Sequence, residues 1–577
     1  MSTSELPGAG LLDVETLARL ANQFFSALPG TVTSELSINN LHAPVMQPLS
    51  SEPPTSFPFS QAGLPHSVPS PGFSPASLPN SAAALQPSWN GQVPLVGASA
   101  KDFGLPDESA LKTLLASAQI SQTQLPIHDA SFPSRSSFYF LDHSRLEKPG
   151  IQVPGFQTEA TPAVPQTGRP PFDINLVRRD FPILRETVKG KPLIWLDNAA
   201  TTQKLTQVIE RLKYFYEHES SNIHRAAHEL AARSTDAYEG AREKVRAFLN
   251  AKSTNEIVFV RGATEAINLV AQSWGKANIG KDDEIIISWL EHHANIVPWQ
   301  QLAAEKGAKL RVIPVDDDGQ VLLDEYAKLL GPKTKLVSFT QVSNALGTVT
   351  PAHQMVAMAQ AAGAKVLVDG AQAVSHMRVD VLALNCDWYV FSGHKVFAPT
   401  GIGVVYGKEA LLNETPPWQG GGNMIKDVTF EHTEYQPAPA KFEAGTGNIA
   451  DAVGLGAAID YVMKLGMDNI CQYEHQLLVY ATQHLQEIPG LRLIGTAKEK
   501  AGVLSFVLEG FKTEEVGSLL NKEGIAVRSG HHCAQPILRR FGLESTVRPS
   551  LAFYNNCADI DALVHAIIKI KSGRSYL

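Results

Sequence analysis

The stretch KVLVDGAQAVSHMRVDVLALNCDWYVFSGHK, residues 365–395, decides the fold of this chain. It contains two short runs, 365–369 and 387–392, that are rich in β-branched and aromatic residues, with a helical pattern between them. Continuous apolar runs of this length predict strands that are buried on both faces. Two such strands joined by a helix predict a parallel pair in an α/β sheet.

The same alternation of apolar runs and helical patterns continues on both sides of this stretch. Further apolar runs predict strands at 256–260, 284–288, 309–315, 335–339 and 401–406. We expect the seven strands to form one mostly parallel sheet in a large domain at 171–454. The pattern changes after about residue 455, which predicts a smaller C-terminal α/β domain at 455–577, with residues 171–196 packing against it.

The first 170 residues have a different composition. They hold 22 of the 37 prolines, and runs such as SEPPTSFPFSQAGLPHSVPSPGFSPASLPN (51–80) show neither a helical nor a strand period. Because little apolar surface is available to offset the entropy of ordering, we expect residues 1–170 to be mostly disordered. A helical pattern at 107–120 and an aromatic cluster at 138–142 are short exceptions.

Another exception is DVETLARLANQFFSALPG (13–30), which predicts an amphipathic helix over 13–28. Its apolar residues recur at steps of three and four, so they share one face. That face either docks on the globular body of the chain or enters a groove on another protein. A flexible tether of ~140 residues spans on the order of 60–70 Å, which is long enough for a separate surface to be bound.

Charge and cysteine content disfavour several classes of protein. The net charge of −8 argues against nucleic acid or an anionic membrane as the main partner. Four widely spaced cysteines without a C-x-x-C pair indicate neither a disulfide framework nor a zinc site. No apolar run approaches the ~18 residues of a membrane span, and the N-terminus lacks the basic region of a secretory signal. We expect a soluble, cytoplasmic protein without a metal centre.

Two polar residues follow neighbouring predicted strands. Asp369 ends the strand at 365–369, and Lys395 follows the strand at 387–392. Taken singly, Asp369 also fits a helix N-cap or a Mg²⁺ ligand, and Lys395 also fits a lysine that faces solvent. Together they fit pyridoxal phosphate, whose enzymes use a Schiff-base lysine and a carboxylate that pairs with the pyridinium nitrogen.

Two other strand ends carry residues suited to an anion and to an aromatic ring. In RGATEAIN (261–268), backbone N–H groups and the Thr264 hydroxyl suit a cofactor phosphate, although an ordinary helix start has the same sequence character. The paired histidines of EHHAN (291–295) could indicate a metal, but no third ligand has a fitting spacing. We favour stacking of the His292 imidazole on a cofactor ring.

One cysteine lies in an unusual setting. Cys533 belongs to VRSGHHCAQP (527–536), where glycine, histidine and the nearby Arg528 replace the apolar neighbours of a structural cysteine. A cation close to a thiol favours the thiolate, which is the nucleophilic form. We therefore predict a reactive role for Cys533.

Taken together, EHHANIVPWQ, VDGAQAV, SGHK, FEAGTGN, RSGHHCAQP and TVRPSLAFYN resemble the motifs of the Suf-type (group II) cysteine desulfurases. These enzymes are a branch of the class V, fold-type-I pyridoxal phosphate enzymes. The resemblance runs from about residue 175 to the C-terminus, with the motifs in order. It implies a fold-type-I fold, pyridoxal phosphate as cofactor, L-cysteine as substrate and a homodimer. Ala263 departs from the pattern, because relatives often carry a second threonine there.

The resemblance also implies a role for each matching cofactor residue. Lys395 would form the Schiff base and shuttle protons, and His292 would stack on the ring. Asp369 would pair with the pyridinium nitrogen and Gln372 with the phenolic oxygen. The cofactor phosphate would be held by Thr264, Ser392, His394 and, from the partner subunit, Thr446.

Substrate binding and sulfur transfer are implied in the same way. Asn344 and Arg548 would grip the substrate carboxylate, with Arg528 as a further substrate-binding residue. Cys533 would take the sulfur as a persulfide, and an acceptor protein or a small thiol would then remove it. Selenocysteine lyase activity is the alternative within the family, because the same residues would accept selenium.

The N-terminal region has a resemblance of its own. Its layout is similar to that of desulfurases carried as cargo by family 2 encapsulins, which bear a long, proline-rich targeting region with short apolar motifs. This resemblance implies that residues 13–30 bind an encapsulin shell protein and that the cytoplasmic enzyme lies inside a nanocompartment.

Two alternative functions outside the cysteine desulfurases would also account for part of this pattern. A pyridoxal phosphate aminotransferase or a kynureninase-like enzyme would share Lys395 and Asp369 but would not need Cys533. A non-enzymatic interaction scaffold would need none of the three, and their joint presence argues against it.

Overall fold

The computed structural model describes residues 171–223 and 227–573. All of these residues belong to one compact unit. The predicted helix at 13–28 and the predicted segments at 107–120 and 138–142 lie outside the described residues.

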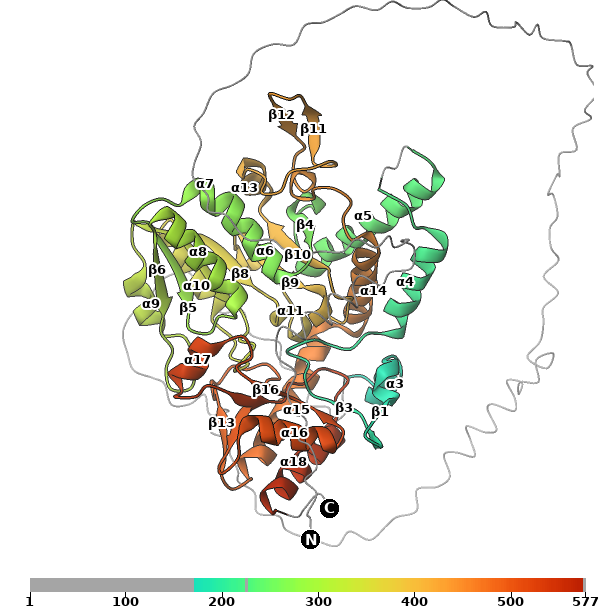
Figure 1. The fold of residues 1–577 in the computed structure, drawn as a ribbon, viewed down its shortest axis with the longest axis vertical. Helices are drawn as coiled ribbons and strands as arrows, with labels where there is room; N and C mark the ends of the chain where they lie inside the picture. Colours follow the sequence, from blue (N-terminus) through green and yellow to red (C-terminus); the bar gives the residue numbers. More distant parts are fainter. Residues whose placement is uncertain (1–170, 224–226, 574–577) are drawn as a thin grey trace, which may run out of the picture. The chain divides into compact units, whose positions relative to one another are not determined.

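A seven-stranded sheet forms the centre of the described part, in the order β4-β10-β9-β8-β7-β5-β6 (Figure 1). Its strands are β4 (Ile257–Val260), β5 (Glu284–Ser288), β6 (Lys309–Ile313), β7 (Thr334–Thr340), β8 (Lys365–Asp369), β9 (Trp388–Ser392) and β10 (Gly403–Gly407). Neighbours among β5 to β9 run parallel, whereas β10 runs antiparallel to both β9 and β4. The predicted mostly parallel, seven-stranded sheet is confirmed, and every predicted strand end lies within two residues of the observed one.

The inner strands of this sheet are buried on both faces. In β8, Val366 and Val368 join one apolar cluster and Leu367 joins the other. In β9, Phe391 and Val390 divide between the two clusters in the same way. A strand that is covered on both faces needs apolar side chains at successive positions, which explains why these strands are continuous apolar runs in the sequence.

Helices cover both faces of the sheet, and α4, α5 and α14 lie side by side in one layer (Figure 1). The cluster that contains Phe391 is completed by α4 (Thr206–His218), α5 (Glu229–Leu249), α9 (Leu323–Leu329), α10 (Ala352–Ala361) and α14 (Ile449–Leu465). The opposite cluster is completed by α6 (Ala263–Val270) and α8 (Val297–Lys306). Shorter helices are α7 (Lys276–Asn278), α11 (Ala373–His376), α12 (Val381–Leu384) and α13 (Glu409–Glu414). Single turns are η3 (Thr254–Glu256), η4 (Ala271–Gly275), η5 (His293–Asn295), η6 (Gly393–Lys395) and η7 (Ala440–Phe442).

The C-terminal part contains a four-stranded antiparallel sheet in the order β13-β14-β17-β16. Its strands are β13 (Leu491–Ile494), β14 (Ser505–Leu508), β16 (Arg528–Gly530) and β17 (Thr546–Arg548). The helices of this part are α15 (Met467–Gln486), α16 (Thr513–Lys522), α17 (Gln535–Arg540) and α18 (Cys557–Lys571). A third apolar cluster, with Leu477, Leu520 and Ile567 among its members, joins α15, α16 and α18 to the sheet.

The first described segment lies against this C-terminal part. It comprises α3 (Ile174–Arg179), η2 (Pro182–Arg185), β1 (Thr187–Val188), β2 (Lys191–Pro192) and β3 (Ile194–Trp195). β3 pairs in parallel with β15 (Ile525–Ala526), with Ile194 opposite Ile525. The division of the chain at 454/455 stays a prediction, and α14 runs through that position.

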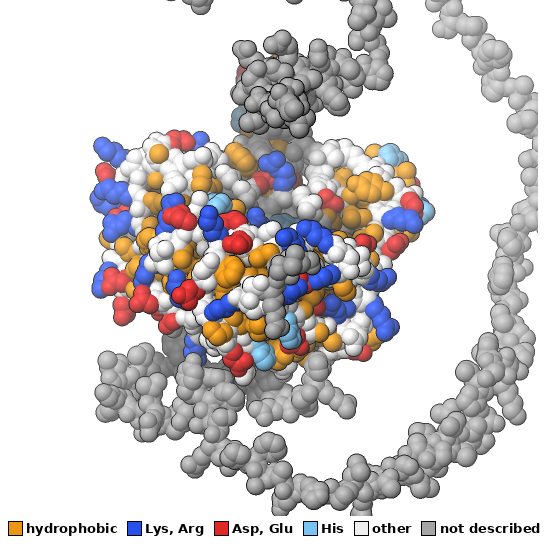
Figure 2. Space-filling view, turned by 60° about the horizontal axis from the view of Figure 1, so that its bottom comes forward, with side chains coloured by type: hydrophobic (Ala, Val, Ile, Leu, Met, Phe, Trp, Pro, Cys, Tyr) orange, Lys and Arg blue, Asp and Glu red, His pale blue; other side chains and the backbone are white. Residues whose placement is uncertain are grey.

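The surface carries one projecting hairpin, formed by β11 (Ile425–Val428) and β12 (Thr433–Tyr435) (Figure 1). Phe430 is fully exposed between its strands. On the face shown in Figure 2, basic and acidic side chains are interspersed with apolar ones. The mixture fits the modest net charge of −8 of the full chain.

A buried ion pair anchors the segment at 443–448. Glu443 accepts hydrogen bonds from both Nη atoms of Arg242 on α5, at 2.7 and 3.0 Å. It also accepts from the Phe259 N–H at 2.8 Å and from the Tyr238 hydroxyl at 3.1 Å. The Arg242 side chain is 3% exposed, so its charge depends on this carboxylate.

Glu443→Ala is expected to lower the free energy of unfolding by about 3–5 kcal/mol, because it leaves the buried Arg242 charge without its main counter-ion. Glu434→Ala is the matched control, since it removes a carboxylate paired with Lys426 at 2.6 Å on the exposed hairpin. The control should cost at most about 1 kcal/mol. Urea titration followed by circular dichroism measures both losses, and equally small losses would contradict the prediction.

Candidate active site

A cavity of about 160 Å³ lies at the carboxyl ends of β7, β8 and β9. All the residues predicted for the site except Thr446 line it, namely Thr264, His292, Asn344, Asp369, Gln372, Ser392, His394, Lys395, Arg528, Cys533 and Arg548. They come from the central sheet and from the C-terminal part. Carboxyl ends of parallel strands meet at one edge of a sheet, which brings residues from distant parts of the chain together.

Asp369 and Lys395 lie at the ends of the paired strands β8 and β9. One carboxylate oxygen of Asp369 accepts a hydrogen bond from the Ala371 N–H at 2.9 Å, and burial raises the pKa of Asp369. Burial lowers the pKa of the Lys395 ammonium to about 8, although the Asp369 charge acts in the opposite direction. A pKa of about 8 leaves part of Lys395 as the neutral amine near neutral pH, and a nucleophilic lysine requires that form.

The N-terminal end of α6 forms another wall of the cavity. Gly262 precedes the helix, and the Ser392 hydroxyl accepts a hydrogen bond from the Ala263 N–H at 2.8 Å. A Cβ atom on Gly403 would overlap the Gly262 backbone, so this close approach of β10 to the helix requires glycine at 403. Thr264 lies in the first turn and lines the cavity. Backbone N–H groups and hydroxyls at a helix start suit an anion.

His292 precedes the turn η5 after β5. Its Nδ1 accepts a hydrogen bond from the Ala294 N–H at 3.0 Å, so the ring proton lies on Nε2. Burial, with the positive charge of Lys395 as the next cause, lowers the pKa of His292 to about 3. The imidazole is therefore neutral, which suits stacking on an aromatic ring.

Glu291 holds this segment from within the core. Its carboxylate accepts hydrogen bonds from the Asn295 side chain at 2.6 Å and from the Thr340 N–H at 3.1 Å, and the Ser288 hydroxyl donates a third. Burial raises the pKa of Glu291 to about 8. Because the bonds join β5, η5 and β7, they fix the backbone on which His292 lies.

The turn that carries Lys395 is fixed by the N-terminal segment of the described part. The His394 carbonyl accepts hydrogen bonds from the Thr202 N–H at 3.0 Å, the Thr202 hydroxyl at 3.1 Å and the Lys204 ammonium at 3.2 Å. The Thr202 hydroxyl also accepts from the Phe397 N–H at 2.8 Å. Burial lowers the pKa of His394 to about 4. The backbone is therefore held on both sides of Lys395.

Arg548 at the end of β17 is a buried cation. It donates to the Asp197 carboxylate at 3.0 Å and to the Asn344 carbonyl at 2.9 Å, and its Nε has no partner in the described part of the chain. Burial lowers the pKa of Arg548 to about 10, so it stays charged at neutral pH. A fixed guanidinium at the cavity suits a carboxylate ligand.

Asn344 uses its amide differently from a carboxylate-binding residue. Its Nδ2 donates to the His532 carbonyl at 2.7 Å, and its buried Oδ1 has no partner among the described residues. Only an N–H can meet a carbonyl oxygen, so the free atom that Asn344 offers is an acceptor. Its predicted grip on the substrate carboxylate stays a prediction.

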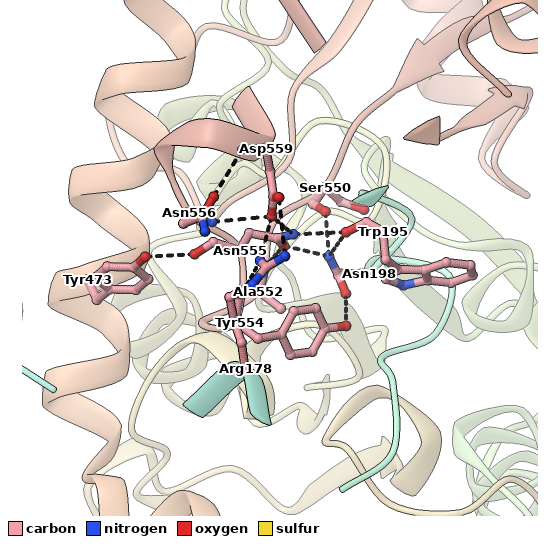
Figure 3. A network of polar contacts seen from close by, with 10 residues as sticks. All are labelled: Arg178, Trp195, Asn198, Tyr473, Ser550, Ala552, Tyr554, Asn555, Asn556 and Asp559. Carbon is pink, nitrogen blue, oxygen red and sulfur yellow. Dashed lines mark hydrogen bonds and ion pairs between the residues drawn. The ribbon is translucent and has the colours of Figure 1, made fainter. Parts of the chain in front are cut away.

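A buried polar network holds Asn198, which lies between β3 and the cavity residue Ala199 (Figure 3). The Asn198 side chain donates to the Ser550 carbonyl at 2.7 Å and to Asn555 Oδ1 at 3.1 Å, and it accepts a hydrogen bond from the Tyr554 hydroxyl. Asn555 in turn donates to the Trp195 carbonyl at 3.0 Å. The network therefore joins the residues around 198 to the chain that follows β17.

The neighbours of Asn198 reach the cavity. Asp197 pairs with Arg548, and the Ala199 carbonyl accepts a hydrogen bond from the Gln372 side chain at 2.7 Å. One short segment thus links the buried cation in the C-terminal part to a cavity residue that follows β8.

Cys533 lies in a turn between β16 and α17, with its side chain partly buried at the cavity wall. Both His532 and Cys533 have φ of +54°, a left-handed conformation that costs about 1–2 kcal/mol at a residue other than glycine. The Cys533 N–H donates to the His531 ring at 3.0 Å, and its carbonyl accepts from the His293 N–H at 2.8 Å. Arg528, at the start of β16, is exposed and lines the same cavity.

Thr446 lies apart from the other predicted residues. It lines a second cavity of about 560 Å³, with Arg261, Glu265 and Trp418 also in its wall. Its hydroxyl lies 3.4 Å from Asn222 Oδ1. The expectation that Thr446 reaches the site of a partner subunit stays a prediction.

The sequence assigned no role to Asp197, Lys204, Glu291 or His532. Asp197 and Lys204 delimit DNAATTQK, a mostly polar run directly after a short apolar stretch, which was the available signal. Glu291 belongs to EHHAN, directly before His292, and His532 belongs to RSGHHCAQP, directly before Cys533.

Within residues 171–223 and 227–573, no group of three or more His, Cys, Asp or Glu side chains could jointly hold a metal ion. None of the helices in those ranges has the length and apolar character needed to cross a membrane.

Several known proteins that are similar to this chain are cysteine desulfurases. The aminotransferase class-V family matches residues 194–563. A cysteine desulfurase of Synechococcus elongatus is 66% identical over 457 residues, which cover 77% of this chain and 72% of that protein. A cysteine desulfurase of Salmonella agona is 52% identical over 400 residues, which cover 69% of this chain and 98% of that protein.

A solved structure supports the same relationship. The crystal structure of the Escherichia coli cysteine desulfurase CsdA, in its S-sulfonic acid form, matches with a TM-score of 0.65 at 38% identity. The match covers 70% of this chain and 99% of that chain. Since the family match alone spans more than half of the sequence, the chain belongs to the aminotransferase class-V family.

Proposed function

We propose that this protein is a pyridoxal phosphate-dependent cysteine desulfurase of the Suf-type group, which converts L-cysteine to L-alanine and leaves the sulfur on Cys533 as a persulfide. The observation that carries the proposal is the presence of the partly buried Cys533 in one cavity with Lys395 and Asp369. An aminotransferase of the same family would need the lysine and the aspartate but no thiol. The desulfurases at 52–66% identity support the proposal.

The residues of the cavity fit pyridoxal phosphate. Two of the proposed substrate-binding residues each have a buried polar atom without a partner in the described part, Asn344 Oδ1 and Arg548 Nε, and such atoms call for a polar ligand. The N–H groups at the start of α6 suit the phosphate. Asp369 would pair with the ring nitrogen, and the partly neutral amine of Lys395 would hold the cofactor covalently.

When bound, pyridoxal phosphate supplies an electron sink for negative charge at the substrate α-carbon. The remaining tasks fall to the residues of the chain. Arg548 binds the substrate carboxylate through its charged guanidinium. Lys395 Nζ moves the proton that leaves the α-carbon. The neutral ring of His292 would pack against the bound cofactor and exclude water there.

The sulfur step falls to Cys533. Its thiolate attacks the sulfur of the substrate, an S–S bond forms, and the Cβ–S bond of the substrate breaks. The electron pair of the broken bond stays with the substrate carbon skeleton and is protonated to give alanine. The carbon is reduced as the transferred sulfur is oxidised, so the step balances without an external oxidant. A second thiol, on an acceptor protein or a small molecule, then removes the sulfur.

The test is a product assay with the holoprotein. With L-cysteine and a small thiol reductant, we expect alanine and sulfide in equal amounts. Amino transfer to a 2-oxo acid without sulfide would contradict the proposal and would favour an aminotransferase. Faster turnover with selenocysteine than with cysteine would favour the lyase.

The Suf-type assignment includes a homodimer in which Thr446 completes the cavity of the partner subunit. It is supported by the motif FEAGTGN and by the separation of Thr446 from the cavity of its own chain. The buried Arg242–Glu443 pair would hold the segment in place for such a contact.

We further infer that residues 13–30 target the enzyme to an encapsulin shell within the cytoplasm. The support is the layout of the first 170 residues, with one amphipathic pattern at the far end of a proline-rich tether. The core match to the Salmonella agona protein covers 98% of that protein but only 69% of this chain. The N-terminal region is therefore additional to the catalytic body.

Deletion of residues 1–170 is expected to leave desulfurase activity intact and to abolish co-purification with a shell protein. Deletion of 13–30 alone should have the same effect on co-purification, because it removes the apolar face and keeps the tether. Purification from the native cell, followed by mass spectrometry of the particle fraction, measures both. A truncated enzyme that still loads into the particle would contradict the targeting proposal.

A further inference from the structure

His532 is a buried side chain beside Cys533 that has no part in the chemistry proposed above. Its Nε2 lies 2.8 Å from the Thr546 hydroxyl and 3.1 Å from the Thr546 carbonyl. A carbonyl can only accept, so Nε2 carries the ring proton and donates to β17. The ring is thereby fixed to a strand of the C-terminal sheet.

The backbone of His532 is fixed from the other side of the cavity. Its carbonyl accepts the hydrogen bond from the Asn344 side chain at 2.7 Å, and the carbonyl of Asn344 accepts from Arg548 at 2.9 Å. His532 is thus held through its ring by β17 and through its carbonyl by Asn344, in the segment that follows β7. Its left-handed φ of +54°, shared with Cys533, needs such restraints to persist.

The remaining ring nitrogen makes no hydrogen bond within the described part of the chain. His532 lines the cavity, and its unprotonated Nδ1 is buried without a partner in the described part of the chain. Burial lowers the pKa of His532 to about 2, with the charge of Arg548 as the next cause. The ring is therefore neutral near neutral pH.

We propose that His532 is a positioning residue that holds Cys533 in the left-handed turn from which its thiol reaches the substrate sulfur, a role that rests on the proposed desulfurase function. Three separate observations carry it: the ring anchor on Thr546, the carbonyl anchor on Asn344 and the paired positive φ angles. The sulfur step needs this placement, because a nucleophile displaced by about 1 Å can lose about 10² in rate.

The variants His532→Asn and His532→Gln test the hydrogen bond between the His532 ring and Thr546. One removes this bond and the other can restore it. Asparagine tolerates a left-handed backbone, but its short amide cannot reach Thr546. Glutamine places its amide nitrogen near the position of Nε2 and can restore the bond. We expect His532→Asn to lower kcat about 10²-fold, with KM and the cofactor absorbance unchanged, and His532→Gln to recover most of the rate.

Alkylation of Cys533 provides a readout that does not depend on activity. The holoprotein is treated with iodoacetamide, and the modified peptide is quantified by mass spectrometry. A released turn should expose the thiol, so alkylation should accelerate in His532→Asn while kcat falls, and should return to the wild-type rate in His532→Gln. His293→Ala is the matched control, because the bond to the Cys533 carbonyl comes from the backbone of residue 293.

The outcomes distinguish the two proposals. Unchanged alkylation and unchanged kcat in His532→Asn would overturn the positioning role, as would a loss of cofactor absorbance in proportion to the loss of rate. If the wild-type protein releases no alanine from cysteine, the proposed function fails, and the alkylation rates still decide whether His532 holds the turn. Should His532→Asn prove insoluble, Asn344→Ala removes the second anchor, and faster alkylation is again the expected result.

Discussion

Cys533→Ser is expected to abolish sulfide release from L-cysteine, with a loss of roughly 10⁴-fold or more in kcat, the range seen when a nucleophile is removed. The serine hydroxyl is far less acidic than a thiol, so the attacking anion is absent at neutral pH. The backbone bonds of residue 533 to His531 and His293 do not involve the side chain and should persist. The cofactor absorbance should therefore remain, and a sulfide assay next to an absorbance spectrum measures both effects.

Cys471→Ser is the matched control for this substitution. Cys471 is exposed on α15 and does not line the cavity, so its replacement should leave sulfide release unchanged. Full activity in Cys533→Ser would show that another group accepts the sulfur, and the proposed step at Cys533 would be wrong.

Lys395→Ala is the second substitution with a large expected effect. It removes the amine that is proposed to move the α-proton, and proton transfer by a positioned side chain contributes about 10²–10⁴-fold. It also removes the proposed covalent link to the cofactor, so the loss in kcat should lie at or beyond the upper end of that range. Borohydride reduction followed by peptide mass spectrometry should find the cofactor on Lys395 in the wild type and on no peptide of the variant.

Lys441→Met is the control for the loss of a buried lysine. The Lys441 ammonium donates to the carbonyls of Asn413 and Thr415, and burial lowers its pKa as it does for Lys395. Lys441 does not line the cavity, so the reduced cofactor should stay on Lys395 in this variant. A cofactor adduct on another lysine of the wild type would contradict the assignment of Lys395.

The lowered pKa of Lys395 also predicts a pH dependence for the binding of pyridoxal phosphate. Because burial lowers this pKa to about 8, the neutral amine increases as pH rises through that value. The rate at which the apoprotein recaptures pyridoxal phosphate should therefore rise with pH and level off above about 8. In Asp369→Asn the rise should move to lower pH, since the Asp369 charge holds the pKa of Lys395 up.

The central sheet could be predicted from the sequence because its signal is local. Each strand of the sheet is a short apolar run, and a strand covered on both faces requires such a run wherever it lies in the chain. The polar residues at the ends of β8 and β9 could be predicted for the same reason. The positions of Asp369 and Lys395 relative to their strands are fixed within a few residues of sequence.

The residues that hold the site could not be found in this way. Asp197 and Arg548 are 351 positions apart, and Asn198 and Asn555 are 357 positions apart. No local pattern relates such residues, because their contact depends on how the first described segment packs on the C-terminal sheet. The positioning role proposed for His532 was hidden for a similar reason. Its anchors are Thr546, 14 positions away, and Asn344, 188 positions away.

The sequence by itself determined the class of fold and the residues at the strand ends, and it suggested the chemistry that is proposed for them. Only the tertiary structure decided which of them share a cavity, since Thr446 carries as clear a motif as Cys533 and yet lies elsewhere. It also decided that Lys395 has a lowered pKa and that His292 is neutral, because both properties come from burial. Burial is a property of the packed chain, and no single segment of sequence contains it.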